Sequence, residues 1–357
     1  MASPVILLFG GKSDERRVSV ASGQNVADSL PEAEPWFLSP QGEVFVCSRT
    51  TLLAHARPFE TDFDPKASKT FSNLSEALNS ETFVNSVFFL ALHGGEGEDG
   101  TLQAEFERLK IPFTGSGAEA SKKSFHKLTT KQVVKANGIR VAPSAEVFSP
   151  SLGEVDRVLR GLFNEHGELI AKPMASGSSV GLMRVKTLED VSKVGVAIAQ
   201  QSLEYLIEKC IQGRELTVGV YEDGKALQAL PPSEVLLKTG RDFDFAGKYL
   251  GQGTQEITPA ALSPQETLQA QTMALVSHRA LGLYGYSRTD MILTTDGPVF
   301  LETNTLPGLT KASFIPQQLA AADISFVDFL NGQVDLARAR YAPRRTHLPI
   351  PQLRVSS

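Results

Sequence analysis

Residues 286–308, YSRTDMILTTDGPVFLETNTLPG, carry the pattern that decides the fold. Two apolar, β-prone runs flank a turn whose Asp296-Gly297 pair favours a tight β-hairpin. Asp290 falls on the first strand, whereas Glu302 and Asn304, two residues apart, fall on one face of the second. Three hard oxygen ligands without His or Cys favour Mg²⁺, which usually binds one or two carboxylates together with nucleotide phosphates. The hairpin therefore predicts a magnesium site.

A simpler interpretation places Asp290 and Glu302 on a solvated strand face. The apolar neighbours Ile292 and Leu301 argue against it, because they put the acidic side next to a buried one. An uncompensated carboxylate beside a core is costly unless a cation neutralises it. Arg288, two residues from Asp290 on the same strand face, supplies part of that compensation.

Composition is that of a globular protein with more than one domain. The 357 residues are 41% hydrophobic and 21% charged, which suits two or three domains. The net charge of −5 and the absence of a basic stripe exclude nucleic acid as a main partner. Cys47 and Cys210 lack metal-binding spacing and favour a reducing compartment. No run reaches membrane-spanning length, so we expect a cytoplasmic protein with no membrane partner.

Strands that end in glycine turns organise the first third of the chain. A buried strand over 4–9 runs into Gly10-Gly11, and a helix follows near Arg17. This order is typical of a Rossmann-type unit, although the third glycine of a dinucleotide fingerprint is missing. A second buried strand, 84–92, ends at His93-Gly94-Gly95. Because sites in open parallel sheets lie beyond the carboxyl ends of strands, both turns are expected to face one crevice.

The rest of the chain alternates between helical and β-prone segments. Helices are predicted over 127–136, 264–282 and 325–338, strands and a helix between 142 and 201, and a β-rich region from 206. The loop 177–181, GSSVG, is either a phosphate cradle or an ordinary hairpin loop. Segment 240–254 has glycines at 240, 247, 251 and 253, which suits a mobile lid that excludes water.

Further motifs stand in a fixed order: FGGKSDE (9–15), ALHGG (91–95), GEDG (97–100), TGSG (114–117), KP (172–173), GSSVG (177–181), ELTV (215–218) and KYL (248–250). Each is weak alone, but their succession over nearly the whole chain is specific. This succession resembles that of the ATP-grasp ligases, and the residues within the motifs resemble those of the D-alanine–D-alanine ligase family. The resemblance implies an α/β, three-domain ATP-grasp fold: an N-terminal Rossmann-like domain over 1–119, a central subdomain over 120–207, a C-terminal subdomain with the metal site over 208–341, and an irregular tail over 342–357.

The resemblance also implies how ATP and metal bind. The phosphates are assigned to Lys127, Lys172 and Lys248, the adenine to Glu208, Lys209 and Ile211, and the ribose to Glu215. Asp290, Glu302 and Asn304 are assigned two Mg²⁺ ions, with Mn²⁺ as an alternative. Without the resemblance, we would interpret Lys127, Lys172 and Lys248 as surface residues and Glu215 as a strand-edge glutamate beside Arg214.

The amino-acid substrates receive their own set of residues from the resemblance. Glu15 holds a substrate ammonium and joins Ser178 and Tyr249 through hydrogen bonds, and His93 lies beside the first substrate. Arg288 and the amide of Gly308 stabilise developing oxyanion charge. Ser313 and Phe314 bind the carboxylate of the second amino acid. Taken alone, Glu15 is a carboxylate at a helix start, and His93 a structural histidine.

The implied activity is ATP-dependent joining of two D-alanines through an acyl phosphate, for peptidoglycan synthesis, in a homodimer. Alternatives are D-serine or D-lactate as the acceptor, and a non-catalytic ATP-binding homologue. Tyr249 argues against D-lactate. The bulk of Phe314 favours D-alanine over D-serine, because a hydroxymethyl group would lose hydration there without an evident partner.

Several positions depart from the family pattern: Arg17, Phe125-His126, Met174-Ala175-Ser176, Cys210, Ala312 and Phe314. The phosphate and metal positions are untouched. The departures at Ala312 and Phe314 surround the second substrate, so the identity of that substrate is the open question in the sequence.

Overall fold

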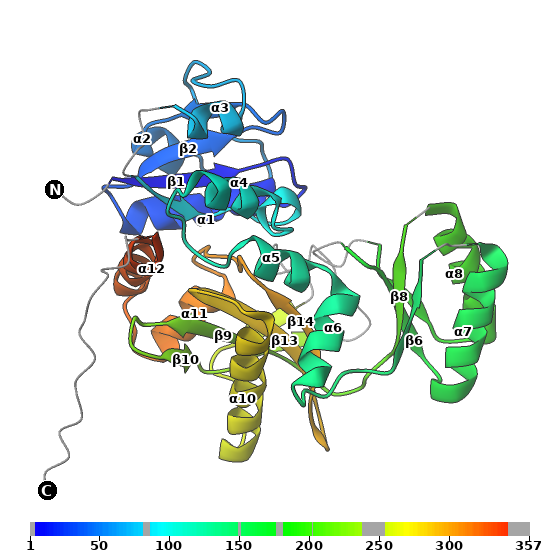
Figure 1. Cartoon of the computed structure of the whole chain (residues 1–357). Coiled ribbons are helices and arrows are strands. Elements are labelled where there is room, and N and C mark those ends of the chain that lie inside the picture. The colour runs from blue at the N-terminus through cyan, green and yellow to red at the C-terminus, as the bar shows by residue number, and fades with distance from the viewer. Residues whose placement is uncertain are drawn as a thin grey trace, which may run out of the picture.

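The computed structural model describes residues 4–80, 86–148, 151–175, 181–201, 203–237 and 254–341. These residues form three sheets, each covered by helices (Figure 1). Ser178 of the glycine–serine loop, Lys248 and Tyr249 of the predicted lid, and the tail from 342 lie outside the described residues. In the part of the chain described, no helix combines the length and apolar character needed to cross a bilayer.

The first sheet has the strand order β3-β2-β1-β4. Its strands are β1 (Val5–Gly10), β2 (Glu34–Leu38), β3 (Val44–Val46) and β4 (Val87–Leu90). β1 is parallel to β2 and β4, whereas β3 is antiparallel to β2. All six residues of β1 are buried, because helices cover both faces of this central strand. The predicted Rossmann-like opening is confirmed, although β4 is shorter than the expected strand over 84–92.

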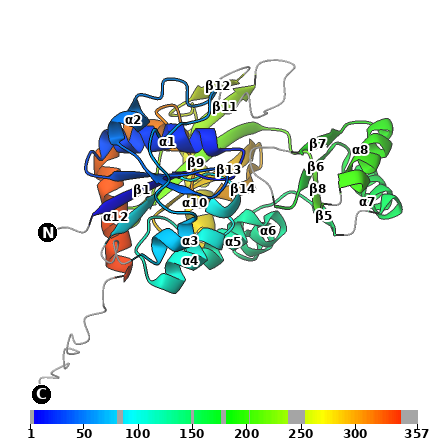
Figure 2. The same ribbon diagram turned by 90° about the horizontal axis from the view of Figure 1, so that it is seen from above.

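Helices from both ends of the chain cover the first sheet. α1 (Arg16–Ser29) and α2 (Arg49–Leu53) pack on one face, and α3 (Leu74–Leu78) and α4 (Thr101–Leu109) on the other. The last helix, α12 (Phe326–Tyr341), also packs on the first face beside α1 (Figure 2). Its Phe329, Leu330 and Val334 share one core with Val5 and Phe9 of β1.

The second sheet is antiparallel, with the order β5-β8-β6-β7. Its strands are β5 (Ser144–Val147), β6 (Leu169–Pro173), β7 (Met183–Val185) and β8 (Tyr205–Lys209). α7 (Leu152–His166) and α8 (Leu188–Gln201) cover one face and bury its apolar side chains. The predicted domain limit at 207/208 falls inside β8, so a division there would cut a strand.

The third sheet has the order β12-β11-β9-β13-β14, with β10 paired to β9. Its strands are β9 (Arg214–Glu222), β10 (Leu227–Ala229), β11 (Ser233–Leu237), β12 (Thr254–Ile257), β13 (Tyr286–Thr294) and β14 (Gly297–Asn304). α5 (Ala118–Phe125), α6 (Lys127–Ala136) and α10 (Pro264–Leu281) cover one face, and α11 (Phe314–Ala321) lies on the other. α5 and α6 belong to this sheet's core, although the sequence suggested a central subdomain for them.

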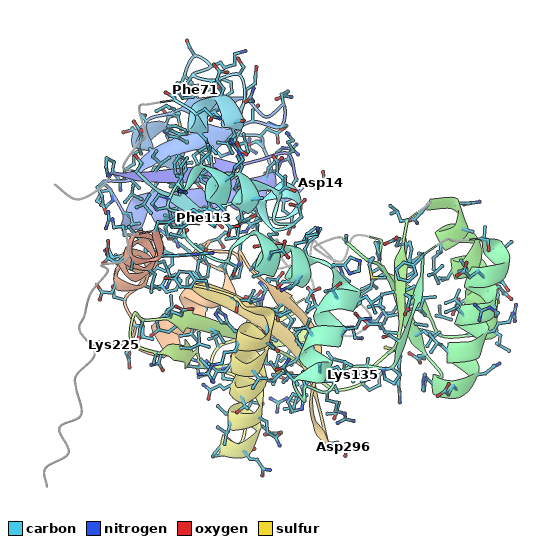
Figure 3. All side chains as sticks on the ribbon, viewed as in Figure 1. Asp14, Phe71, Phe113, Lys135, Lys225 and Asp296 are labelled. Carbon is cyan, nitrogen blue, oxygen red and sulfur yellow. The ribbon has the colours of Figure 1, made fainter. Side chains whose placement is uncertain are left out.

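The predicted hairpin is confirmed as β13 and β14, whose exposed turn carries Asp296 at its tip (Figure 3). Gly297 has φ +101°, a conformation that favours glycine. Asp290 pairs with Glu302, but the next pair is Met291 with Phe300, so Leu301 forms a β-bulge. Beyond the bulge, Arg288 pairs with Asn304 and Asp290 with Glu302. These four polar side chains lie on one face of the hairpin, because directly paired residues share a face.

Candidate active site

Ten of the predicted site residues line one cavity between the first and third sheets: Glu15, His93, Glu215, Arg288, Asp290, Glu302, Asn304, Gly308, Ser313 and Phe314. They come from the glycine turns of the first sheet, from β9, β13 and β14, and from the turn before α11. Sequence distances of more than two hundred residues are therefore closed by the packing of the first sheet onto the third.

Asp290 is the centre of a polar cluster on the hairpin. Its Oδ1 accepts hydrogen bonds from Thr217 Oγ1 at 2.5 Å and Arg288 Nε at 2.8 Å. Its Oδ2 accepts from Arg288 Nη2 at 2.8 Å and Asn304 Nδ2 at 3.2 Å. Asp290 is buried, and its side chain is 13% exposed. The bidentate guanidinium confirms that Arg288 compensates the buried carboxylate.

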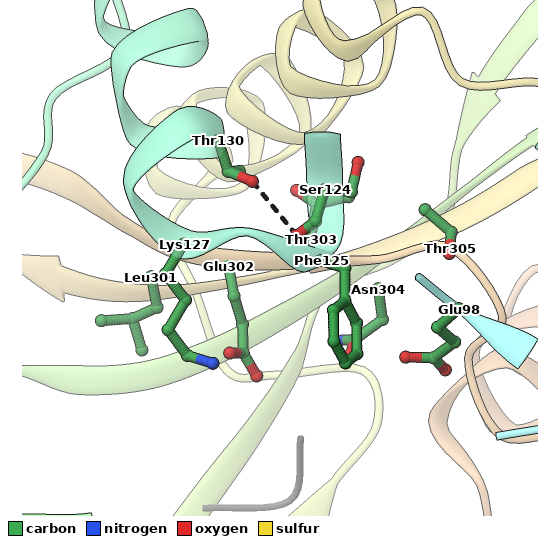
Figure 4. A pocket seen from close by; sticks show the side chains of 10 residues that line it. All are labelled: Glu98, Ser124, Phe125, Lys127, Thr130, Leu301, Glu302, Thr303, Asn304 and Thr305. Atoms are coloured by element: carbon green, nitrogen blue, oxygen red, sulfur yellow. Dashed lines mark hydrogen bonds between the residues drawn. The ribbon is translucent and has the colours of Figure 1, made fainter. Parts of the chain in front are cut away.

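Glu302 and Asn304 also line a second cavity, which opens on the α6 side of the hairpin. In Figure 4 the ammonium of Lys127, the first residue of α6, points toward the carboxylate of Glu302. Thr130, on the next turn of α6, donates a hydrogen bond to the carbonyl of Ser124 at 3.1 Å and ties α6 to α5. Lys127, one of the predicted phosphate lysines, and two of the three predicted metal ligands therefore line the same cavity.

The donor set fits a divalent cation of the Mg²⁺ class. Asp290, Glu302 and Asn304 offer carboxylate and amide oxygens from paired strands, and these are hard ligands. Among the described residues, no three His, Cys, Asp or Glu side chains come together as a complete cation site. Mg²⁺ usually keeps few protein ligands and takes the others from water and substrate phosphates, so the three oxygens of Asp290, Glu302 and Asn304 are compatible with it.

The predicted adenine and phosphate residues Glu208 and Lys172 lie in a buried ion-pair cluster. Glu208 Oε2 contacts the ammonium of Lys172, and its Oε1 contacts that of Lys131. Lys131 is 4% exposed and also donates to the carbonyl of Ala142 at 3.2 Å. Lys131 was not expected from the sequence, although its position one helical turn after Lys127 places both on one face of α6.

The other residues assigned to adenine, Lys209 and Ile211, line a separate cavity together with Cys210 and Val299. Lys209 follows Glu208 on β8, so the two side chains lie on opposite faces of the strand. Glu215 lies on β9, two residues before Thr217, the residue that pairs with Asp290, and it lines the main cavity instead.

The two glycine turns of the first sheet meet, as predicted. A Cβ on Gly94 would lie 2.5 Å from both Glu15 Oε2 and Ser13 Oγ, and φ at Gly94 is +66°. Glycine at this position is what allows the carboxylate to approach the turn. Glu15 therefore lies beside His93 at the edge of the cavity.

His93 is buried and ties the first sheet to the third. Its Nδ1 lies 2.9 Å from the carbonyl of Leu306, which can only accept, so Nδ1 carries the proton. Its Nε2 then accepts from Ser22 Oγ at 2.8 Å. Burial lowers the pKa of His93, which keeps the ring neutral. The role of His93 in this structure is therefore to hold the 305–310 turn in place beside the cavity.

The turn before α11 presents the remaining predicted residues. Ser313 Oγ lies 3.1 Å from Thr310 N and 2.8 Å from Thr310 Oγ1. A Cβ on Gly308 would lie 2.7 Å from Ser313 Oγ, so this glycine permits the tight approach. The guanidinium of Arg288 lies 5.7 Å from the ring centroid of Phe314, within cation–π range.

Several cavity residues were not predicted as functional: Glu98, Thr217, Glu256 and Thr310. Burial, and next the charge of Glu15, raise the pKa of Glu98 to about 8. Thr217 stands two residues after Glu215 on the same strand, so strand alternation could have revealed it. Glu98 stood inside the GEDG motif, but nothing in the sequence showed that it would line this cavity.

Comparison with known proteins agrees with this geometry. Residues 4–116 match the family description "D-ala D-ala ligase N-terminus", and residues 133–334 match "D-ala D-ala ligase C-terminus". The chain is 34% identical over 351 residues to a D-alanine–D-alanine ligase of Leptospira interrogans, covering 94% of this chain and 98% of that protein. It is also 34% identical over 341 residues to one from Nitratidesulfovibrio vulgaris, with 93% and 97% covered.

Solved structures show the same fold. The VanG D-Ala:D-Ser ligase of Enterococcus faecalis superposes with a TM-score of 0.79 at 26% identity, covering 94% of this chain and all of that one. The D-alanine–D-alanine ligase of Coxiella burnetii gives 0.77 at 25% identity, with 95% of each covered. From motif order, fold and these matches together, the chain belongs to the D-alanine–D-alanine ligase family and has its ATP-grasp fold.

Proposed function

We propose that this protein joins two D-alanine molecules into D-alanyl-D-alanine at the expense of ATP, for peptidoglycan synthesis. The γ-phosphoryl group of ATP passes to the carboxylate of the first D-alanine and leaves ADP. The amine of the second D-alanine then attacks the acyl carbon. The carbon–nitrogen bond forms, and the carbon–oxygen bond to phosphate breaks with its electron pair on phosphate. The released phosphate takes up the proton that the nitrogen loses.

The observation that carries this proposal is the single cavity shared by Glu15, the hairpin cluster and the Ser313 turn. A ligase of this kind needs a carboxylate for a substrate ammonium, cation-binding oxygens for phosphate, and a fixed positive group for the developing oxyanion. The cavity brings all three kinds of group together from two sheets.

The hairpin residues receive the metal and phosphate roles. Asp290, Glu302 and Asn304 would hold two Mg²⁺ ions, which neutralise phosphate charge during transfer. Lys127 and Lys172 are assigned to the phosphates, Glu208 with Lys209 and Ile211 to adenine, and Glu215 to ribose. Because Lys172 is paired with buried Glu208, it has to exchange this carboxylate for phosphate when the nucleotide binds.

The acyl-transfer step is assigned to Arg288 and the amide of Gly308. Arg288 is held by two hydrogen bonds to Asp290 and by the ring of Phe314, so its charge is fixed before substrate arrives. Preorganised charge of this kind stabilises an oxyanion without reorganisation. Glu15 is assigned to the first substrate's ammonium, with Ser178 and Tyr249 as its partners and Lys248 on the γ-phosphate; these three lie outside the described residues.

A second candidate acceptor is D-serine, because a D-Ala:D-Ser ligase is among the similar solved structures. Phosphate release distinguishes the two acceptors when it is measured with D-alanine alone and then with D-alanine plus D-serine, D-lactate or glycine. We expect full activity with D-alanine alone. Equal use of D-serine or D-lactate would replace the proposal, and no release with any amino acid would favour a non-catalytic ATP-binding protein.

We infer further that the chain works in the cytoplasm as a homodimer. Light scattering on a sizing column tests the dimer, since a monomer and a dimer of a 38.6 kDa chain separate clearly.

A further inference from the structure

Glu256 is a carboxylate of the main cavity to which the assigned roles give no task. It lies on β12 and lines the cavity together with Arg288, Ser313 and Phe314. It pairs across the strands with Val235, which lines the same cavity. Its side chain therefore lies on the cavity face of the third sheet, next to the turn assigned to the second amino acid.

A hydrogen bond from an uncharged donor on α11 holds the Glu256 carboxylate in place. Gln317 Nε2 donates to Glu256 Oε2 at 2.8 Å and to the carbonyl of Ala312 at 2.7 Å. Thr258 Oγ1 donates to Gln317 Oε1 at 3.1 Å and sets the orientation of the amide. The side chain of Gln317 thus links the Glu256 carboxylate to Ala312, the residue that precedes Ser313.

The surroundings of Glu256 suit a cationic guest. Burial raises the pKa of Glu256, while the hydrogen bond from Gln317 and the charge of Arg288 oppose that rise. Arg288 already gives Nε and Nη2 to Asp290. A half-buried carboxylate such as that of Glu256, with an uncharged donor at one oxygen, gains a stronger hydrogen bond from a charged donor that arrives with a ligand.

We propose that Glu256 binds the ammonium group of the second amino acid. This inference rests on the proposed function. An α-amino acid is a zwitterion whose two charges sit on neighbouring atoms, so a pocket for it needs a site for each charge. The Ser313 turn at the start of α11 takes the carboxylate, and Glu256, tied to the same turn through Gln317, takes the ammonium.

This arrangement makes Glu256 a specificity residue. An acceptor with an amine gains a charge-assisted hydrogen bond from Glu256, whereas a hydroxy acid such as D-lactate offers only a neutral hydroxyl. The Glu256 carboxylate therefore favours an acceptor amine, which forms a peptide bond, over an acceptor hydroxyl, which forms an ester.

Glu256→Gln tests the proposal, because the amide keeps the shape and a hydrogen bond to Gln317 but removes the charge. The KM of the second D-alanine should rise about 10- to 100-fold, the range for losing a hydrogen bond to a charged group. The KM of the first D-alanine and of ATP should not change. The preference for D-alanine over D-lactate should fall by a similar factor, measured as dipeptide against depsipeptide formed in a mixture.

Glu234→Gln is the matched control. Glu234 lies one strand away on β11 and is a buried glutamate, but it pairs with Arg214 Nη2 at 2.6 Å. It immediately precedes Val235, so its side chain lies on the opposite face of the sheet, and it is not among the residues that line the cavity. Its substitution should leave the KM of the second D-alanine unchanged.

Glu256→Asp separates charge from shape. It keeps the charge and should retain the discrimination against D-lactate that Glu256→Gln loses; equal loss in both variants would overturn the proposal. An unchanged second KM in a folded Glu256→Gln protein would also overturn it. Absence of dipeptide synthesis in the unmodified protein would instead contradict the proposed function, so the two failures can be told apart.

Discussion

Glu302 is the residue on which the metal hypothesis depends most directly. It pairs with Asp290 across the hairpin and lines both cavities. Glu302→Gln should abolish phosphate release, because an amide removes the negative charge that would bridge two cations, while the apo fold persists. Asp296→Asn, at the exposed hairpin tip, is the control and should retain activity. Near-normal release by Glu302→Gln in saturating Mg²⁺ would contradict the assignment.

Phe314 is expected to set the size of the second-substrate pocket. D-alanine should exceed D-serine in kcat/KM by roughly 5- to 150-fold, since a buried hydroxyl without a partner costs about 1–3 kcal/mol. Phe314→Leu should narrow that gap without changing the first-substrate step. Competition between the two acceptors at equal concentration measures the ratio. An unmodified protein that uses both acceptors equally would show that Phe314 does not select.

Glu98 predicts how the stability of the metal-free protein depends on pH. Its pKa is about 8 in the fold against an ordinary 4.5, so the folded chain keeps a proton that the unfolded chain has lost. The free energy of unfolding should therefore decrease as pH rises from about 4.5 through about 8. Glu98→Gln, neutral throughout, should flatten this decrease in urea unfolding, whereas Glu96→Gln, at a nearby half-buried residue that pairs with Lys12, should not. If the free energy of unfolding decreased equally with pH in the unmodified protein and both variants, Glu98 would not be the group responsible.

The residues that the sequence could reveal are those related by short spacing. The two-residue interval between Glu302 and Asn304 fixes a common face, and Arg288 and Asp290 follow by the same rule. Lys131 and Glu256 were not predicted, because their hydrogen-bond partners lie 77 and 61 residues away in the sequence. Those distances are closed by tertiary packing, which no local pattern encodes.

At the scale of single elements, α10 shows how a sequence signature sets a boundary. Ser263 Oγ accepts from Glu266 N at 3.3 Å, and Glu266 Oε2 accepts from Ser263 N at 2.7 Å, which is a capping box. Ser263→Ala should lower the free energy of unfolding by about 0.5–2 kcal/mol. Gln265→Ala, inside the same turn but outside the box, should change it by less than about 0.5 kcal/mol. Chemical denaturation of both variants measures the difference; equal effects would exclude the cap as the cause.

Helices with such signals were predicted to within a few residues. The expected helix over 127–136 is α6, and the expected start at residue 264 is that of α10. The bulge at Leu301 was not foreseen, because a bulge depends on the partner strand's register. Nor did the sequence reveal which sheet α5 and α6 cover, since an amphipathic face does not name the surface that buries it.

For the molecule as a whole, α12 makes the stability of the first sheet depend on a helix at the other end of the described chain. Phe329, Leu330 and Val334 each contribute about 1.5–3 kcal/mol of burial, together comparable to the net stability of a domain. A chain that ends at residue 323 should therefore lose cooperative unfolding of the first sheet. A chain that ends at residue 341 should keep it. Fluorescence of Trp36, the single tryptophan, buried in β2, reports the difference. Native-like Trp36 emission in the shorter chain would contradict this view.

The same dependence governs how the chain acquires its structure on the ribosome. β1 and β4 emerge early, but the helix that completes their core follows roughly 230 residues later, which at about 5–20 residues per second is some 10 to 50 seconds. During that interval the apolar face of the nascent sheet lacks its cover. We therefore expect the amino-terminal unit to be a target for chaperones that hold unfinished chains, and to become protease-resistant only after α12 has been made.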